Sequence, residues 1–268
     1  MITVLCLNYL CLYKLTILSR NFIIEQLKQA FKGQDSFSRE ALYKFYLQFE
    51  PDLKETTFRW RIYNLKEKNL IRSISRNEFT LIYKPVFKPE IGEGEQRIFA
   101  LIEKGFKALK KSLLSTRIIN EFMLHQPVRF FTLVEVEKDA LESVFYYLRD
   151  NGIRNVFLQP EEKELQRYVS ELDNAIILQS LVSKAPLQKV KKISTATLEK
   201  LLVDLFCDKK LFYTYQGSEL VFIFNSAYHR YSIDFTKLFG YAQRRNRETD
   251  LMEFLSDKTD IPKTILND

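Results

Sequence analysis

The sequence predicts an α+β protein of two domains. A basic amphipathic helix within residues 52–69 is followed at once by two short alternating strands. After residue 94, apolar strands alternate with helices, which favours a mixed α/β layer structure. Between these parts, residues 85–94 contain two prolines and two glycines and are expected to form a linker. Only seven Gly and seven Pro occur, which argues against a sandwich of many short strands.

Residues 1–20 stand apart from this plan. They carry no charge before Lys14, so the apolar run is too short to span a bilayer. They also lack the basic start and the small-residue cleavage site of a signal peptide. A leading strand or helix, a weak surface anchor and a misplaced start codon remain open, and we favour a start placed too far upstream.

Three helices and a hairpin are expected next. The helices cover residues 21–31, 39–49 and 52–69, and the strands cover residues 70–75 and 78–83. Ser38 is a good N-cap for the second helix, whereas Asp52 and Glu55 form a capping-box pattern for the third. Asn69 can end the third helix in left-handed geometry. This order of elements predicts a winged helix-turn-helix domain over residues 21–84.

The third helix has the strongest functional pattern. Phe58, Ile62 and Leu65 form its apolar stripe, and the opposite face is polar, aromatic and basic. From Lys54 to Arg72, six basic residues stand against two acids, and such a helix suits the major groove of DNA. The expected base contacts are Thr56, Thr57, Trp60 and Asn64, and the expected phosphate or minor-groove contacts are Arg59, Arg61, Lys68, Arg72, Arg76 and Asn77. The alternative is that this module packs only against protein.

The second domain is expected over residues 95–268. Helices are expected over residues 95–111, 115–124, 138–150, 162–170, 195–206, 218–227, 235–245 and 248–255, and strands over residues 130–136, 154–158 and 174–183. The last of these strands is nearly continuous in apolar residues, which is typical of a strand buried on both faces.

No catalytic, metal or cofactor site is expected, and the chain is not expected to be an enzyme. Three Cys and two His fit neither a disulfide framework nor a zinc pattern, which favours a reduced, cytoplasmic setting. One carboxylate cluster, Glu135 and Glu137 before Lys138, is off register for a nuclease motif of the restriction-endonuclease type. A metal-dependent nuclease that uses these acids stays as an alternative. Asp204, in an apolar helix, is expected to pair with Arg244 or Arg245.

Four segments together resemble a known family. TTFRWRIYNLKEKNLIRSISRNEFTL, VEVEKDALESVFYYL, LEKLLVDLF and YAQRR resemble bacterial AbiEi-like proteins, and the resemblance covers residues 21–255. These are winged-helix antitoxins and autoregulators of type IV, abortive-infection toxin–antitoxin systems. The family usually has a glycine where this chain has Asn69.

The resemblance implies a sequence-specific DNA-binding regulator that represses its own operon by binding inverted repeats in promoter DNA. It also implies a functionally paired nucleotidyltransferase-like toxin, countered without a stable complex, and a second domain required for antitoxicity. It implies no catalytic residues, no cofactor and no membrane partner.

Overall fold

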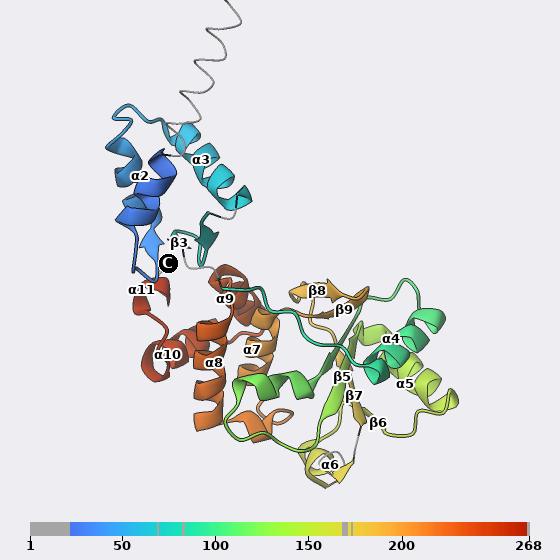
Figure 1. Ribbon diagram of the computed structural model, residues 1–268. Helices are drawn as coiled ribbons and strands as arrows, with labels where there is room; N and C mark the ends of the chain where they lie inside the picture. Colours follow the sequence, from blue (N-terminus) through green and yellow to red (C-terminus); the bar gives the residue numbers. More distant parts are fainter. Residues whose placement is uncertain (1–21, 69, 82–83, 168–170, 173, 267–268) are drawn as a thin grey trace, which may run out of the picture. The chain divides into compact units, whose positions relative to one another are not determined.

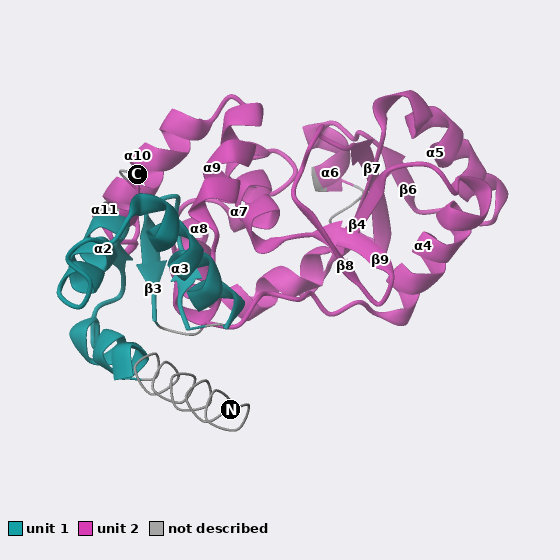
Figure 2. Cartoon of the chain, turned by 90° about the horizontal axis from the view of Figure 1, so that it is seen from above, with its two compact units in different colours: residues 1–83, 268 teal, residues 84–267 magenta. Residues whose placement is uncertain are grey.

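The computed structural model describes residues 22–68, 70–81, 84–167, 171–172 and 174–266. The chain divides into two compact units, with the division after residue 83 (Figure 2). Helices and strands occur in both units, so the protein is α+β, as expected. Residues 1–20, Asn69 and residues 82–83 lie outside the described part, and so do the predictions made for them.

The described part of unit 1 combines helices with a three-stranded antiparallel sheet. Its elements are a helix over residues 22–30, β1 (Phe37–Ser38), α2 (Arg39–Leu47), α3 (Glu55–Glu67), β2 (Arg72–Ser73) and β3 (Glu78–Thr80). The strand order is β1-β3-β2, because Phe79 pairs with Phe37 on one side and with Ser73 on the other. The hairpin expected after α3 is therefore present with a shorter ladder, and β1 was not expected.

Local signals explain the start of α2, but not that of α3. Ser38 caps α2 as expected, since its Oγ accepts a hydrogen bond from the Ala41 amide at 3.0 Å. The capping box predicted for α3 at Asp52 and Glu55 is not formed. This helix begins at Glu55 after an extended Lys54 that makes no side-chain cap. Leu53 is buried and its carbonyl accepts a hydrogen bond from Tyr43 Oη at 2.7 Å, so tertiary contacts hold the chain outside helical geometry there.

Unit 2 is built on a four-stranded sheet of order β4-β5-β7-β6 (Figure 1). The strands are β4 (Lys111–Ser115), β5 (Phe131–Val136), β6 (Val156–Leu158) and β7 (Ala175–Ser180), with a separate hairpin of β8 (Leu187–Val190) and β9 (Ile193–Ala196). β4 is antiparallel to β5, whereas β5, β7 and β6 run parallel. The helices are α4 (Glu93–Gly105), α5 (Leu141–Asp150), α6 (Glu162–Arg167), α7 (Leu198–Cys207), α8 (Ser218–Arg230), α9 (Phe235–Arg244), α10 (Glu248–Lys258) and α11 (Lys263–Leu266). Short 3-10 helices cover Thr116–Phe122, Lys138–Ala140 and Tyr213–Tyr215.

The two faces of β5 serve different purposes. Successive side chains of a strand point to opposite faces. Val134 and Val136 enter an apolar core that includes residues of α4 and α5. Glu135, between them, points to the other face and meets Lys200 of α7. A strand that is buried from Thr132 to Val136 therefore presents one charged side chain to the helical part of unit 2.

Three expectations for unit 2 are corrected. Residues 85–94 are no free spacer, since Phe87 and Ile91 are buried and the Pro85 carbonyl accepts a hydrogen bond from the Ser232 amide. The helix expected over residues 95–111 ends at Gly105, and β4 follows it. The helix expected from residue 195 begins at Leu198, because the preceding residues pair in β9.

Candidate nucleic-acid interface

The outer face of α3 is the first candidate surface in unit 1 for contact with nucleic acid. Phe58, Ile62 and Leu65 are buried, which confirms the expected apolar stripe. Trp60 and Tyr63 lie on the opposite face, with 56% and 59% of their surface exposed. Tyr63 is missing from the contacts expected from the sequence, although steps of about 100° per residue place it beside Trp60.

Polar and charged side chains follow the exposed side of α3 from one end to the other. Thr56 and Thr57 are exposed in the first turn, near the partial positive charge of the helix N-terminus. Arg59 is exposed one turn further along. At the other end, Glu67 is exposed beside Lys68. The first turn also carries the acid Glu55 and the last turn carries Lys66, so both halves of α3 combine acids with bases.

Arg61 does not belong to this open surface. Its Nη2 lies 2.5 and 2.6 Å from the two carboxylate oxygens of Glu50, and its Cζ lies 5.2 Å from the ring centroid of Tyr46. Both partners belong to α2 or the turn after it. The phosphate contact expected of Arg61 stays a prediction, and in this structure its guanidinium holds α3 against the end of α2 through Glu50.

Arg59 is far more available to a ligand. Its side chain is 74% exposed, and its Nε lies 3.3 Å from the Glu55 carboxylate, a weak surface ion pair. Glu55 is also hydrogen-bonded by Arg39, which lowers the pKa of Glu55 and keeps that carboxylate satisfied when Arg59 turns away.

A pocket of about 310 Å³ lies beside the outer face. It is lined by Ile23, Ile24, Tyr46, Trp60, Arg61, Asn64, Leu65, Lys68 and Leu70. The structure thus brings four of the expected contacts to one pocket: Trp60, Arg61, Asn64 and Lys68. Asn64 donates a hydrogen bond from Nδ2 to the Trp60 carbonyl at 3.1 Å, so base recognition by Asn64 requires its side chain to turn outward.

The hairpin after α3 presents the remaining candidates. Arg76 and Asn77 are exposed in the turn between β2 and β3, whereas Arg72 is half-buried in β2 opposite Thr80. The Asn77 carbonyl accepts a hydrogen bond from the Arg39 amide at 2.6 Å, which ties the turn to the start of α2. The turn is therefore held to α2 through the Asn77 carbonyl, and the Arg76 side chain is exposed to solvent.

A buried ionic cluster lies inside unit 2. Lys200 Nζ is 2.7 Å from Glu135 and 2.5 Å from Asp204. Asp204 also accepts hydrogen bonds from Tyr241 Oη at 2.9 Å and from Arg245 Nη1 at 2.8 Å. The expected pairing of Asp204 with Arg245 is confirmed. Lys200 was missed, although it precedes Asp204 by one helical turn on α7.

The cluster shifts the pKa values of its members. Burial lowers the pKa of Lys200, but the attraction of Asp204 and Glu135 outweighs burial and raises that pKa well above its ordinary value. Burial raises the pKa of Glu135 and of the Tyr241 hydroxyl. Lys200 is about 1% exposed, so the cluster joins β5, α7 and α9 and offers no open site to a substrate.

The same geometry weakens the nuclease alternative. Glu135 faces Lys200, whereas Glu137 accepts a hydrogen bond from the Lys110 amide at 3.3 Å. These two carboxylates therefore do not converge on one position. In the described part of the chain, no group of three or more His, Cys, Asp or Glu side chains is placed to hold a metal ion.

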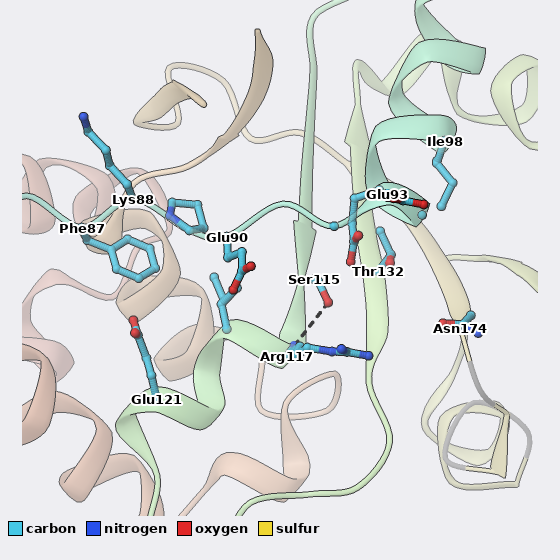
Figure 3. A pocket seen from close by; sticks show the side chains of 15 residues that line it. Phe87, Lys88, Glu90, Glu93, Ile98, Ser115, Arg117, Glu121, Thr132 and Asn174 are labelled. Atoms are coloured by element: carbon cyan, nitrogen blue, oxygen red, sulfur yellow. Dashed lines mark hydrogen bonds between the residues drawn. The ribbon is translucent and has the colours of Figure 1, made fainter. Parts of the chain in front are cut away.

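A larger pocket of about 560 Å³ lies in unit 2, where β4 ends and β5 and β7 begin (Figure 3). Thr132 and Asn174 line it from the starts of these strands, and Glu93 from the first turn of α4. Arg117 is exposed here, and its amide donates to Ser115 Oγ at 3.4 Å. The lining contains more acidic than basic residues. None of its described residues forms a nucleophile–base pair.

His125, His229 and Cys207 are each in contact with groups that give them no catalytic partner among the described residues. His125 Nδ1 lies 2.6 Å from Glu219, and the His229 ring packs edge-on against Tyr228. Cys207 is partly buried at the end of α7, and burial raises the pKa of its thiol to about 11, which disfavours the reactive thiolate.

Comparison with known proteins assigns the chain to a family. The model of DUF6577, described as a family of unknown function, matches residues 57–261, about three quarters of the chain, and the chain belongs to this family. No curated protein matches it. Within the described residues, none of the helices has the length and apolar character needed to cross a bilayer.

Proposed function

We propose that this member of the DUF6577 family is a sequence-specific DNA-binding protein whose unit 1 is a winged helix-turn-helix domain. The observation that carries the proposal is the outer face of α3, where Thr56, Arg59 and Trp60 are exposed on a helix packed by its other face. An α-helix that offers hydroxyl, guanidinium and aromatic groups fits the major groove.

The order of elements in unit 1 supports the winged-helix assignment. The helix of residues 22–30, β1, α2 and α3 are followed by β2 and β3, which pair through a tight turn. In this arrangement α3 is the recognition helix and the β2–β3 hairpin is the wing. β1 adds to the wing strand β3, which fixes the hairpin to the helical core.

The charge of this region supports an anionic partner. From Lys54 to Arg76, seven basic residues stand against two acids. In the proposed complex Thr56, Thr57, Trp60 and Asn64 contact bases, and Arg59, Lys68, Arg72, Arg76 and Asn77 contact the backbone or the minor groove. Arg61 positions α3 through Glu50.

The biological role proposed is that of a transcriptional autoregulator and antitoxin of a type IV toxin–antitoxin system. This part rests on the resemblance to AbiEi-like proteins. The protein would bind inverted repeats in its own promoter DNA and counter a nucleotidyltransferase-like toxin without a stable complex. A promoter–reporter fusion tests the first role and co-expression with the neighbouring open reading frame tests the second.

The direct test is a gel-shift with DNA from upstream of the coding sequence, with a scrambled duplex of equal length as the control. We expect preferential retardation of the upstream fragment at low salt. Arg59→Ala should weaken binding and lower the slope of log affinity against log salt by about 1, because one phosphate contact is lost. Equal affinity for both duplexes would remove the proposal.

A specific observation favours a second candidate, a protein-docking module. Trp60 and Tyr63 are exposed together on α3, whose pocket has both apolar and polar lining residues, and aromatic side chains of this kind dominate protein interfaces. This function predicts that Trp60→Ala abolishes capture of a protein partner, whereas Arg59→Ala leaves that capture unchanged.

A further inference from the structure

The β8–β9 hairpin of unit 2 ends in two lysines. The last pair of the ladder joins Val190 to Ile193, so Lys191 and Lys192 form the whole turn. Their φ angles are +48° and +69°, both in the left-handed region. A two-residue turn with both φ angles positive is of the kind that matches the right-handed twist of the flanking strands.

Lysine is a poor choice for the conformation of this turn. Asn-Gly and Asp-Gly dominate such turns, because glycine has no Cβ and the Asn or Asp side chain bonds locally. Lys184, before β8, also has a positive φ, of +56°. Local backbone preference therefore does not account for the lysines, and residues held against their preference concentrate at functional positions.

The hairpin is also a region of unopposed positive charge. Lys184, Lys189, Lys191 and Lys192 are all exposed, and the sequence from residue 174 to residue 198 contains no Asp or Glu. The first acid after it, Glu199, is buried and accepts a hydrogen bond from the Asp234 amide. Within the residues that the structure describes, no carboxylate pairs with any of the four lysines.

The base of the hairpin is fixed in the fold. Ala196 at the base and Ile193 next to the turn are both buried, and Gln188 Nε2 donates to the Ala196 carbonyl at 2.9 Å. The Thr197 amide donates to the Pro186 carbonyl at 3.2 Å, which closes the open end of the ribbon. The two lysines therefore lie in the turn of a short ribbon whose open end is closed by hydrogen bonds, and Figure 1 shows its strands β8 and β9.

We propose that the β8–β9 hairpin is a second DNA contact, which binds the phosphate backbone of duplex DNA through Lys191 and Lys192. The phosphate groups are the same at every base step, so a lysine contact to them carries no sequence information. The proposal rests on duplex DNA being a ligand of this protein. It adds a backbone contact from unit 2 to the base reading proposed for α3.

The test compares the full-length wild type with Lys191→Asn/Lys192→Gly. This variant removes two charges and gives the turn the residues that it prefers, so the hairpin keeps its fold. The control, Lys209→Asn/Lys210→Gly, removes the other adjacent pair of exposed lysines in unit 2. Thermal melting verifies that both variants are folded.

Fluorescence anisotropy with a random-sequence duplex is measured over about 50 to 200 mM salt. We expect the hairpin variant to lower the slope of log affinity against log salt by about 1.8, the value for two lost phosphate contacts. The control should keep the wild-type slope. An unchanged slope in the hairpin variant, or an equal change in the control, overturns the proposal.

Two further arms separate related outcomes. Vesicles with phosphatidylserine replace the duplex in one arm, and a loss of binding confined to the vesicles overturns the proposal in favour of a membrane surface. In the other arm, the affinities of wild type and of Trp60→Ala/Asn64→Ala are each measured on the upstream duplex and on the random duplex. If wild type shows no preference for upstream DNA while the hairpin slope still falls, the function proposed for α3 fails and the hairpin contact stands.

Discussion

Arg59 and Arg61 are two residues apart on α3 and have different surroundings. The Arg61 side chain is about one-quarter exposed and donates hydrogen bonds to both carboxylate oxygens of Glu50, whereas the Arg59 side chain is about three-quarters exposed. A helical face assigned from the sequence puts both at its flanks, because helical position alone does not show which guanidinium meets a carboxylate.

Arg61→Ala should therefore act on stability. We expect a loss of about 1–3 kcal/mol, because the substitution removes two charge-assisted hydrogen bonds and leaves the Glu50 carboxylate without them. Arg59→Ala should change the free energy of unfolding by less than about 0.5 kcal/mol. Urea unfolding followed by tryptophan fluorescence measures both, since Trp60, the single Trp, lies on the same helix. An equal, small effect of the two variants would contradict the assignment of Arg61 to α3–α2 packing.

Lys200 is the residue whose removal should cost unit 2 most. In Lys200→Met, Glu135 and Asp204 stay buried without the cation between them, and breaking such a pair destabilises by about 3–5 kcal/mol. Lys237→Met, which removes a mostly exposed partner of Asp234, should cost less than about 1 kcal/mol. Urea unfolding of the two variants measures this difference.

The same residue sets an alkaline limit to stability. The folded pKa of Lys200 is raised above the ordinary 10.5, so its contribution is fully present below that pH and is lost as pH rises above it. The burial-raised pKa of Tyr241 acts in the same direction. We expect the stability of wild type to fall more steeply above about pH 10.5 than that of Lys200→Met. Parallel pH profiles would show that the cluster does not carry this dependence.

At the scale of elements, the sequence predicted those helices, strands and caps whose formation depends on neighbouring residues in the chain. The Ser38 cap, the apolar stripe of α3 and the buried strand β7 were all visible in the sequence. The α+β fold class was predicted from the same periodicity of apolar residues. The β2–β3 hairpin was also expected, because its strands are adjacent in the chain.

Elements that depend on distant partners were missed. β1 has two residues and exists through pairing with β3, about forty residues further on. β4 follows a lysine-rich tail that continues the helical pattern of α4, yet Lys111 is buried, with its Nζ 2.6 Å from Glu103 and donating to the Phe106 carbonyl. Glu135 and Lys200 meet across 65 positions. No local pattern contains these contacts.

The end of α4 offers a matched pair of glycine substitutions. A Cβ on Gly105 would lie 2.7 Å from Cζ of Tyr147, a ring that is itself packed edge-on against Phe106. Gly105→Ala should cost about 1–3 kcal/mol, because the aromatic ring must move. At Gly94, in the first turn of the same helix, a Cβ meets nothing within 4 Å.

Gly94→Ala should stabilise by about 0.5–1 kcal/mol, because alanine reduces the backbone entropy of the unfolded chain. Thermal unfolding of both variants distinguishes the effects. If Gly105→Ala were as well tolerated as Gly94→Ala, the close approach of α4 to Tyr147 would not limit packing there.

At the scale of the whole molecule, each unit has its own apolar core. The core of unit 1 draws on residues from Leu27 to Phe79, and that of the unit 2 sheet on residues from Ile91 to Ile193. Among the described residues these two cores share no member, so we expect residues 84–268 to fold without unit 1. A single cooperative urea transition and resistance to limited proteolysis are the expected results for this fragment.

The fragment also separates the two proposed DNA contacts. The protein has a net charge of +7, so weak, salt-sensitive binding to any duplex is expected of the intact chain. Without α3, the fragment should lose preference for upstream DNA, while its residual binding to a random duplex still depends on Lys191 and Lys192. Anisotropy titrations of the fragment against both duplexes measure this. A fragment that still prefers the upstream duplex would move base reading from α3 into unit 2.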